Sequence, residues 1–285
     1  MKKLFLVFQH CIPQHLLSRL LGRLAESRLP FLKNFLINRF IRHYQVNMSE
    51  ARRQTAADYA CFNDFFTRQL QTEARPLASA ADAIISPVDG TVSAIGDIDD
   101  ERIFQAKGKS FSLRALLAED VDLISQFKGG KFATLYLSPR DYHRIHMPTN
   151  GKLEKMIYVP GKLFSVNQTT AEGIDNLFAR NERAICHFQT EQGPLSLVLV
   201  GALIVAGIET VWAGPVAPGH SLHTETYQEQ TAIQLGRGEE MGLFKLGSTV
   251  ILLFPAHQMS WNDGLDVGAS IRMGQAIGSY CNAGN

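Results

Sequence analysis

The sequence predicts an α+β protein in which N-terminal amphipathic helices precede a predominantly antiparallel β core. Residues 13–43 repeat apolar side chains at helical spacing. From about residue 80, short apolar runs alternate with Gly, Pro, Asn and Asp, a texture typical of strands and turns. The 285 residues, of which 45% are hydrophobic and 19% charged, are enough for one sizeable core with an appended helical element.

The first helix is predicted to begin near Pro13, because proline is well tolerated in the first helical turn. Its leucines fall on one face, and Arg19 and Arg23 lie off that face. The apolar set consists of Leu16, Leu17, Leu20, Leu21 and Leu24. Pro30 interrupts the pattern and marks the end of this helical segment.

A second amphipathic helix is predicted directly after the first. Its apolar side consists of Phe31, Leu32, Phe35, Leu36, Phe40 and Ile41. Lys33, Arg39 and Arg42 are expected on the opposite side. An apolar helix face can pack on its own domain, whereas a basic amphipathic helix can also lie in a membrane interface. The periodicity alone leaves both alternatives open.

The longest uncharged stretch, residues 192–208, approaches the length of a membrane-spanning helix. Its composition favours a different structure. Val198 and Val200 are β-branched, and Gly201 and Gly207 interrupt the stretch. We therefore predict two buried strands around a bend.

Charge is distributed unevenly along the chain. Residues 1–53 carry ten Lys/Arg and two Glu, a net charge of +8, whereas the other 232 residues carry 18 basic and 25 acidic side chains, a net charge of −7. A basic, apolar N-terminus on an acidic body indicates an anionic membrane surface as partner. No Lys/Arg block interleaved with stacking aromatics is present elsewhere, so nucleic-acid binding is not expected.

The cysteines and the N-terminal segment indicate a cytoplasmic setting. The four cysteines are scattered without a Cys-x-x-Cys pair, which argues against a disulfide framework and fits a reducing compartment. Residues 1–8 imitate a signal peptide, but their apolar stretch is only five residues long and no small-residue cleavage site follows. We expect this segment to be retained.

The tetrapeptide Leu-Gly-Ser-Thr at residues 246–249 lies between two apolar, strand-like stretches. Gly247 has no Cβ, which leaves its carbonyl open to attack, and Ser248 places a hydroxyl beside that carbonyl. The same hydroxyl can leave in a β-elimination. Because Gly-Ser-Thr is also an ordinary turn sequence, the assignment depends on residues elsewhere in the chain.

Two further segments supply groups that could activate Ser248. Residues 136–148 place His143 and His146 three apart between apolar flanks, and Asp89 follows a short apolar run. An imidazole that accepts a proton makes a serine hydroxyl nucleophilic, and a carboxylate fixes the imidazole tautomer. Ser248, His146 and Asp89 are therefore the candidate nucleophile, base and orienting carboxylate.

Each of these elements also has a structural interpretation. Asp89 and Gly90 form a common turn pair, and the two histidines could be ordinary surface residues. A zinc site at His143 and His146 would need a third ligand, and no Cys/His/Glu cluster with metal-ligand spacing supplies one, so no metal is expected.

Taken together, these segments resemble the signature blocks of the phosphatidylserine decarboxylase family, whose members are pyruvoyl enzymes that cut themselves. The resemblance extends from about residue 62 to residue 278. It includes ordered agreement at residues 62–68, 105–108, 158–161, 163–167, 177–183 and 209–214.

The resemblance implies that Ser248 attacks the carbonyl of the chain's own Gly247. The resulting ester would eliminate to leave a pyruvoyl group at position 248, so that residues 1–247 and 248–285 become two chains that remain associated. The pyruvoyl ketone would form a Schiff base with the substrate amine and act as electron sink, which removes the need for an external cofactor. His143 would handle protons at the substrate carbon during decarboxylation.

We therefore expect a proenzyme that converts phosphatidylserine to phosphatidylethanolamine. Residues 1–75 would form a membrane-association region and residues 76–285 the catalytic core. The protein would bind phosphatidylserine and the anionic lipid of the cytoplasmic side of the cell membrane as a peripheral protein. The sequence leaves the oligomeric state open, a homodimer included.

Two rival functions come from other classes. A Ser/His/Asp hydrolase of external esters is disfavoured because the chain has no Gly-x-Ser-x-Gly elbow. A membrane-binding module that has lost processing is disfavoured by the complete set of Asp89, His146, Gly247 and Ser248.

Overall fold

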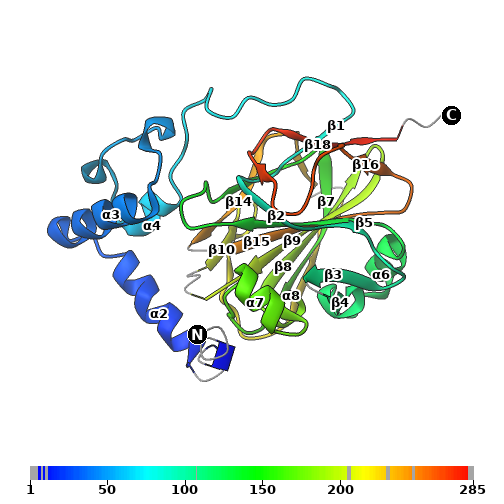
Figure 1. Ribbon diagram of the computed structural model, residues 1–285, viewed down its shortest axis with the longest axis horizontal. Coiled ribbons are helices and arrows are strands. Elements are labelled where there is room, and N and C mark those ends of the chain that lie inside the picture. The colour runs from blue at the N-terminus through cyan, green and yellow to red at the C-terminus, as the bar shows by residue number, and fades with distance from the viewer. Residues whose placement is uncertain are drawn as a thin grey trace.

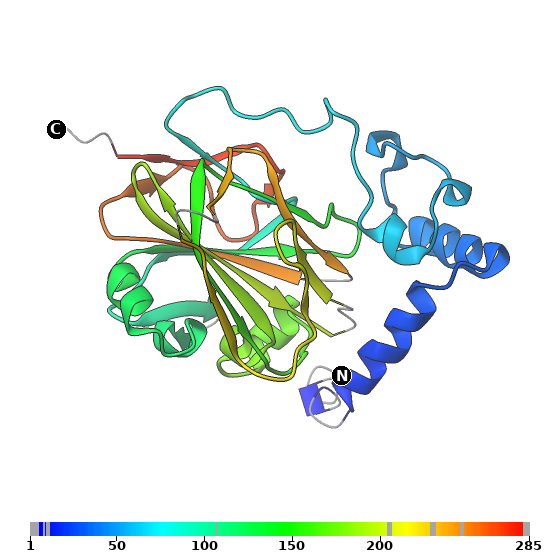
Figure 2. The same cartoon turned by 180° about the vertical axis from the view of Figure 1, so that it is seen from behind.

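The helices and the strands occupy different parts of the molecule. The computed structural model describes residues 6, 7, 9, 12–106, 108–203, 207–228, 232–245 and 248–281. Helices α2, α3 and α4 lie to one side of a β body, and an extended segment leads from them to β1 (Figure 1). The view from behind shows the same separation (Figure 2). The predicted α+β class, with N-terminal helices followed by an antiparallel β core, is confirmed.

Helix α2 (Gln14–Ala25) begins after Pro13, as predicted. The face that it buries carries small and polar side chains, namely Gln14, Ser18, Gly22 and Ala25. Polar contacts attach this face to the β body: the side-chain carbonyl of Gln14 accepts a hydrogen bond from the backbone N–H of Leu163 at 2.8 Å. The leucine face turns away from the body, and Leu20 is 54% exposed.

Helix α3 (Pro30–Tyr44) starts at the predicted proline and ends at Gln45, which adopts the left-handed conformation with φ of 54°. Phe31 and Phe35 are exposed, at 87% and 56%. The predicted position of Lys33 on the solvent face is wrong. Lys33 is buried because its ammonium donates hydrogen bonds of 3.1 Å to the backbone carbonyls of Ala56 and Ala57 and to the side chain of Asn34.

Short elements close the N-terminal region. They are the 3-10 helices η1 (Met48–Glu50) and η2 (Ala56–Asp58) and helix α4 (Phe62–Phe66). Their aromatic side chains pack with α2 and α3 in a small hydrophobic cluster of Ala25, Ile37, Val46, Ala56, Tyr59, Phe62, Phe65 and Phe66. This cluster gives the N-terminal region a core of its own.

The β body is built around a large sheet with the strand order β12-β7-β8-β9-β15-β5-β2-β17, in which β13 also pairs with β7. Its strands are β2 (Gly90–Asp97), β5 (Lys131–Leu137), β7 (Gly151–Val159), β8 (Arg183–Thr190), β9 (Gly193–Gly201), β12 (His223–Thr226), β13 (Ile233–Leu235), β15 (Ser248–Phe254) and β17 (Ser270–Ile271). All pairings between the named strands in the described ranges are antiparallel.

Smaller sheets complete the body. One has the order β11-β10-β14-β6, another β1-β18-β16, and a third pairs β3 with β4. Their strands are β11 (Gly214–Ala217), β10 (Gly207–Thr210), β14 (Glu240–Lys245), β6 (Arg144–His146), β1 (Ala83–Ile85), β18 (Ala276–Tyr280), β16 (Met259–Trp261), β3 (Arg102–Ala106) and β4 (Lys109–Ser112). Strand β9 confirms the first of the two buried strands predicted for residues 192–208, whereas the second strand, β10, begins only at Gly207 and extends beyond that stretch to Thr210.

Both faces of the large sheet are buried. Along β15, Val250 and Leu252 enter one hydrophobic cluster, whereas Ile251 and Leu253 enter another, as the alternation of side chains along a strand requires. The first cluster also contains side chains of β6, β10, β14 and β18. The smaller sheets therefore cover the face of β15 that carries Val250 and Leu252.

Four short helices cover the face of the large sheet that carries Ile251 and Leu253, and the sequence pattern did not indicate them. They are α5 (Leu113–Leu116), α6 (Val121–Phe127), α7 (Gln168–Gly173) and α8 (Leu177–Arg180). Each contributes buried side chains to the cluster that holds Ile251. Within the described residues, no helix is long and apolar enough to cross a membrane.

Candidate active site

Ser248 is the first residue of β15 and lies in the middle of the large sheet. It pairs with Leu137 of β5 on one side and with Gly201 of β9 on the other. By the alternation along β15, its side chain shares a face with Val250, toward β6 and β14. The hydroxyl is fully buried and has no hydrogen-bond partner among the described residues. Gly247, the other half of the predicted cleavage site, lies outside the described residues.

His143 lies in the connection between β5 and β6, after a turn in which Asp141 accepts a hydrogen bond of 2.7 Å from the backbone N–H of Ser138. Its Nδ1 is 2.9 Å from the backbone carbonyl of Asp141. A carbonyl can only accept, so Nδ1 carries the proton and Nε2 presents its lone pair. Nε2 is buried without a partner among the described residues. Burial, with a smaller effect from Arg68, lowers the pKa of His143 to about 3, so the imidazole is neutral near pH 7.

His146 ends β6 and uses both of its ring nitrogens. Nδ1 donates to the backbone carbonyl of Gly238 at 2.8 Å, which leaves Nε2 to accept a hydrogen bond of 3.0 Å from the Tyr142 hydroxyl. The two rings also stack, with centroids 5.6 Å apart. Burial lowers the pKa of His146, so this imidazole also favours its neutral form.

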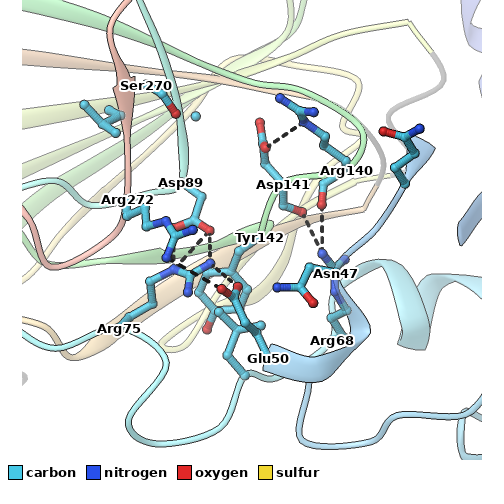
Figure 3. Close-up of a pocket in the computed structure, with 14 residues that line it drawn as sticks. Asn47, Glu50, Arg68, Arg75, Asp89, Arg140, Asp141, Tyr142, Ser270 and Arg272 are labelled. Carbon is cyan, nitrogen blue, oxygen red and sulfur yellow. Dashed lines mark hydrogen bonds and ion pairs between the residues drawn. The ribbon is translucent and has the colours of Figure 1, made fainter.

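Asp89 is bound by an arginine of the N-terminal region. Arg75 approaches both carboxylate oxygens, with its Nε 2.8 Å from Oδ1 and its Nη2 2.5 Å from Oδ2, and the backbone N–H of Met273 donates a third hydrogen bond at 2.9 Å. The same guanidinium pairs with Glu50 at 2.8 Å (Figure 3). No hydrogen bond between Asp89 and His146 occurs among the described residues: the ring proton of the neutral His146 goes to the Gly238 carbonyl, and Arg75 contacts both carboxylate oxygens.

Asp89 and His146 nevertheless open into neighbouring cavities. Asp89 lines a cavity of about 290 Å³ and His146 one of about 590 Å³. Arg75 and Tyr142 line both cavities. Tyr142 therefore contacts the imidazole of His146 and also borders the cavity of the carboxylate that was predicted to pair with it.

The N-terminal region also contributes side chains that the sequence analysis did not assign to the site. The ring of Phe66 lies 4.1 Å from the ring of His143, centroid to centroid. Arg68 donates to the backbone carbonyl of Arg140 at 2.8 Å. The sequence offers one signal for these residues: Arg68 ends a run rich in phenylalanine, and a charged side chain in such a run is often buried at a functional site. Their contacts required the fold.

The two histidines do not form part of a metal site in the described structure. Within the described ranges, no group of three His, Cys, Asp or Glu side chains is placed to hold a metal ion. His143 and His146 direct their Nδ1 protons to backbone carbonyls of different segments.

A serine hydroxyl at the start of a buried strand and two neutral imidazoles define a protein with the groups for serine-based acyl chemistry in its interior, although no hydrogen bond joins the hydroxyl to either imidazole among the described residues. Comparison with known proteins makes the class specific. The family model described as phosphatidylserine decarboxylase matches residues 62–279, and a second model, described as PSD, matches residues 4–45. The chain belongs to the phosphatidylserine decarboxylase family.

Relatives of nearly equal length support this assignment. The chain is 56% identical over 279 residues to a phosphatidylserine decarboxylase proenzyme of Azotobacter vinelandii, covering 97% of this chain and 98% of the relative. It is 53% identical to the proteins of the same name in Hahella chejuensis and Bordetella avium. Those matches cover 97% and 96% of this chain and 93% and 94% of the relatives.

Proposed function

We propose that this chain is a phosphatidylserine decarboxylase proenzyme that cleaves itself between Gly247 and Ser248. The processed enzyme converts phosphatidylserine to phosphatidylethanolamine and carbon dioxide. The observation that carries the proposal is the Ser248 hydroxyl, buried at the start of a central strand without a hydrogen-bond partner in the described structure. A buried polar group without a partner costs free energy, and such groups persist where they react.

In the self-cleavage step, the Ser248 oxygen attacks the Gly247 carbonyl and His146 takes the hydroxyl proton. The peptide bond is replaced by an ester and a free amine. Elimination across the Cα–Cβ bond of residue 248 then releases the Gly247 carboxylate and leaves dehydroalanine. Water hydrolyses the dehydroalanine to a pyruvoyl group with release of ammonia. The Gly238 carbonyl orients His146, the charge of Asp89 stabilises its protonated form without a hydrogen bond between them in the described structure, and the Tyr142 hydroxyl must turn away from Nε2 before His146 can accept a proton.

The surroundings of residue 248 fit a pyruvoyl group. The Ser248 hydroxyl makes no hydrogen bond that its loss would break within the described structure. The buried Nε2 of His143 is an unused acceptor, which a pyruvoyl group without N–H or O–H would leave free for a substrate proton. The pyruvoyl group supplies an electron sink for the decarboxylation of an amino acid headgroup. His143 holds and returns the proton at the substrate carbon, a task suited to an imidazole.

The two chains formed by cleavage are proposed to stay together. Strand β15 would belong to the chain of residues 248–285, yet it is hydrogen-bonded on both edges to β5 and β9 of the chain of residues 1–247. Its residues from Val250 to Phe254 are fully buried. Removing β15 would expose both hydrophobic clusters and two strand edges.

The two N-terminal helices are proposed to lie on the cytoplasmic surface of the membrane as a peripheral anchor. The exposed apolar side chains are Leu16, Leu20, Leu24, Leu29, Phe31 and Phe35. The buried face of α2 is polar or small, and of the leucines of this helix Leu16, Leu20 and Leu24 are exposed. Large apolar side chains exposed together with basic ones are typical of helices that lie in a lipid interface.

Removing basic residues from the two helices should weaken membrane binding. Arg19, Arg23, Arg39 and Arg42 are exposed, and their replacement by Gln removes four positive charges. At the usual contribution of a basic residue near anionic lipid, binding should fall by about 100-fold or more at low salt. Wild-type binding should weaken with salt without vanishing, because the buried apolar area is insensitive to ionic strength. Co-sedimentation with anionic liposomes measures both effects.

A matched control removes the same charge from the far end of the β body (Figure 1). It replaces Arg102, Lys109, Arg114 and Lys128, in or next to β3, β4, α5 and α6, by Gln. This control should sediment like the wild type, and both variants should self-cleave normally. Equal sedimentation of the helix variant and the wild type would mean that another surface meets the lipid.

Intact-mass measurement of the purified protein under denaturing conditions tests the proposed function as a whole. We expect two masses, one for residues 1–247 and one for residues 248–285 with a pyruvoyl group at its first position. The purified protein should release carbon dioxide from phosphatidylserine. A single mass of the uncut chain, or an ordinary serine at the start of the small chain, would contradict the proposal.

A further inference from the structure

The sequence Phe-Thr-Arg at residues 66–68 lies directly against the loop that carries His143. We propose that Phe66 and Arg68 are positioning residues for decarboxylation, which hold His143 in one tautomer and one orientation. The inference rests on the role proposed above for His143. It assigns a function to a segment of the N-terminal region, 75 residues or more from the histidine in sequence.

The three consecutive residues each contact the loop. The ring of Phe66 lies against the ring of His143, tilted by 46°. The backbone carbonyl of Thr67 accepts a hydrogen bond of 2.9 Å from Nε of Arg144. Arg68 completes the set, because its Nη2 donates to the backbone carbonyls of Arg140 at 2.8 Å and Asp141 at 3.4 Å (Figure 3).

The Asp141 carbonyl is the link between Arg68 and His143. It accepts the Nδ1 proton of His143 at 2.9 Å and the weaker hydrogen bond from Arg68 on the same oxygen. Arg68 therefore fixes the acceptor that determines the tautomer of His143. Phe66 blocks one side of the ring, so that the imidazole cannot turn its Nε2 away without losing both contacts.

The burial of Arg68 is energetically unfavourable. Its side chain is 3% exposed, and its Nε and Nη1 have no hydrogen-bond partner among the described residues. No carboxylate forms an ion pair with it within the described structure. The ion pairs near the site join Arg75 to Asp89 and Glu50, Arg144 to Glu240, and Arg140 to Asp141. A buried cation without a counter-charge is destabilising, which a purely structural position would avoid with an apolar residue.

The charge of Arg68 has an effect on His143 that an apolar residue could not supply. Burial is the main cause of the low pKa of His143, and the positive charge of Arg68 lowers it further. The other charged groups of the surroundings are engaged elsewhere: Asp141 accepts from the N–H of Ser138, and Arg144 pairs with Glu240. An imidazolium formed beside Arg68 would thus be a stronger acid, which favours return of its proton to the substrate carbon.

The main experiment compares Arg68→Gln with Arg140→Gln in the full-length protein. Arg140 belongs to the same loop and carries the same charge, but its side chain is 66% exposed. Arg68→Gln should cleave into two chains, lose about 100-fold in kcat for a soluble short-chain phosphatidylserine, and keep KM within about threefold, since misplacement of a reacting group lowers the rate of the chemical step. Arg140→Gln should match the wild type.

The pH profile distinguishes positioning of His143 from general damage. Removing the Arg68 charge raises the pKa of His143, so the acid limb of the kcat profile should move to higher pH in Arg68→Gln. Arg68→Lys keeps the charge and should leave the limb near its wild-type position, with an intermediate kcat. Phe66→Leu should also lower kcat. Because this variant keeps the Arg68 charge, it should shift the acid limb of the kcat profile less than Arg68→Gln does.

Wild-type kcat together with an unshifted acid limb in a cleaved Arg68→Gln enzyme would overturn the inference. A wild-type protein that neither cleaves nor decarboxylates would instead remove the proposed function on which it rests. If Arg68→Gln fails to fold, nitrogen NMR of His143 in the Ser248→Ala precursor decides. A neutral ring with the proton on Nδ1 at about pH 6 supports the inference, and an imidazolium or the other tautomer at that pH contradicts it.

Discussion

The Ser248→Ala variant is expected to remain one chain of 285 residues and to show no decarboxylase activity. Alanine lacks both the nucleophilic oxygen and the β-leaving group, so neither the ester nor the elimination product can form. The side chain sits on a fully buried, regular strand, and its hydroxyl has no hydrogen-bond partner in the described structure. The variant should therefore fold at least as stably as the unprocessed wild type. A denaturing gel and intact-mass measurement read out the result.

Thr249→Val is the matched control for this variant. Thr249 is the next residue of β15, equally buried, with a hydroxyl that also lacks a partner among the described residues. It points to the opposite face of the sheet, away from β6 and β14. Removal of this second hydroxyl should leave cleavage intact. Two chains from Ser248→Ala, or one chain from Thr249→Val, would contradict the placement of the reacting hydroxyl.

The two histidines are expected to separate cleavage from decarboxylation. His146→Ala should slow self-cleavage by at least about 100-fold, the usual contribution of a positioned general base. His143→Ala should still yield two chains but lose decarboxylation by a similar or larger factor. Timed gels after synthesis measure cleavage, and release of carbon dioxide from the cleaved fraction measures decarboxylation. If His143→Ala blocks cleavage and His146→Ala does not, the two roles must be exchanged.

The contacts of Asp89 sharpen the expectation for a third variant. Asp89→Asn should slow cleavage markedly, because the amide carries no charge to stabilise a protonated His146. It would also weaken the pair with Arg75, which would retain Glu50. Because Asp89 contacts Arg75 rather than His146, Arg75→Gln should also slow cleavage. Normal cleavage in both variants would remove Asp89 from the mechanism.

The periodicity of the sequence was sufficient to predict the two N-terminal helices, the start of the first near Pro13 and the break at Pro30. It could not predict which face of the first helix packs on the body. Ser18 and Gly22 are buried because small side chains allow close approach, whereas the leucines remain outside. A hydrophobic pattern records where apolar residues gather, but it does not record what covers them.

The candidate site was predictable to the extent that it lies within short segments. The spacing of His143 and His146 and the Gly-Ser step before β15 are visible in the sequence. The ion pair of Asp89 with Arg75 cannot be predicted from the sequence, because no residue spacing links a carboxylate on one loop to a guanidinium on another. The four short helices over the second cluster escaped prediction for a related reason: elements of four to seven residues are too short to show a helical period.

Because β15 lies between β9 and β5, the proposed cleavage would change how the protein recovers from unfolding. The uncut precursor folds as one molecule, so its recovery from denaturation is independent of protein concentration. Once residue 248 begins a separate polypeptide, unfolding releases the central strand of the sheet into solution, and refolding becomes an encounter between two species. Dilution then works against recovery. The lifetime of the mature enzyme would therefore be set by its rate of unfolding, because each molecule that unfolds in dilute solution would be lost as a catalyst.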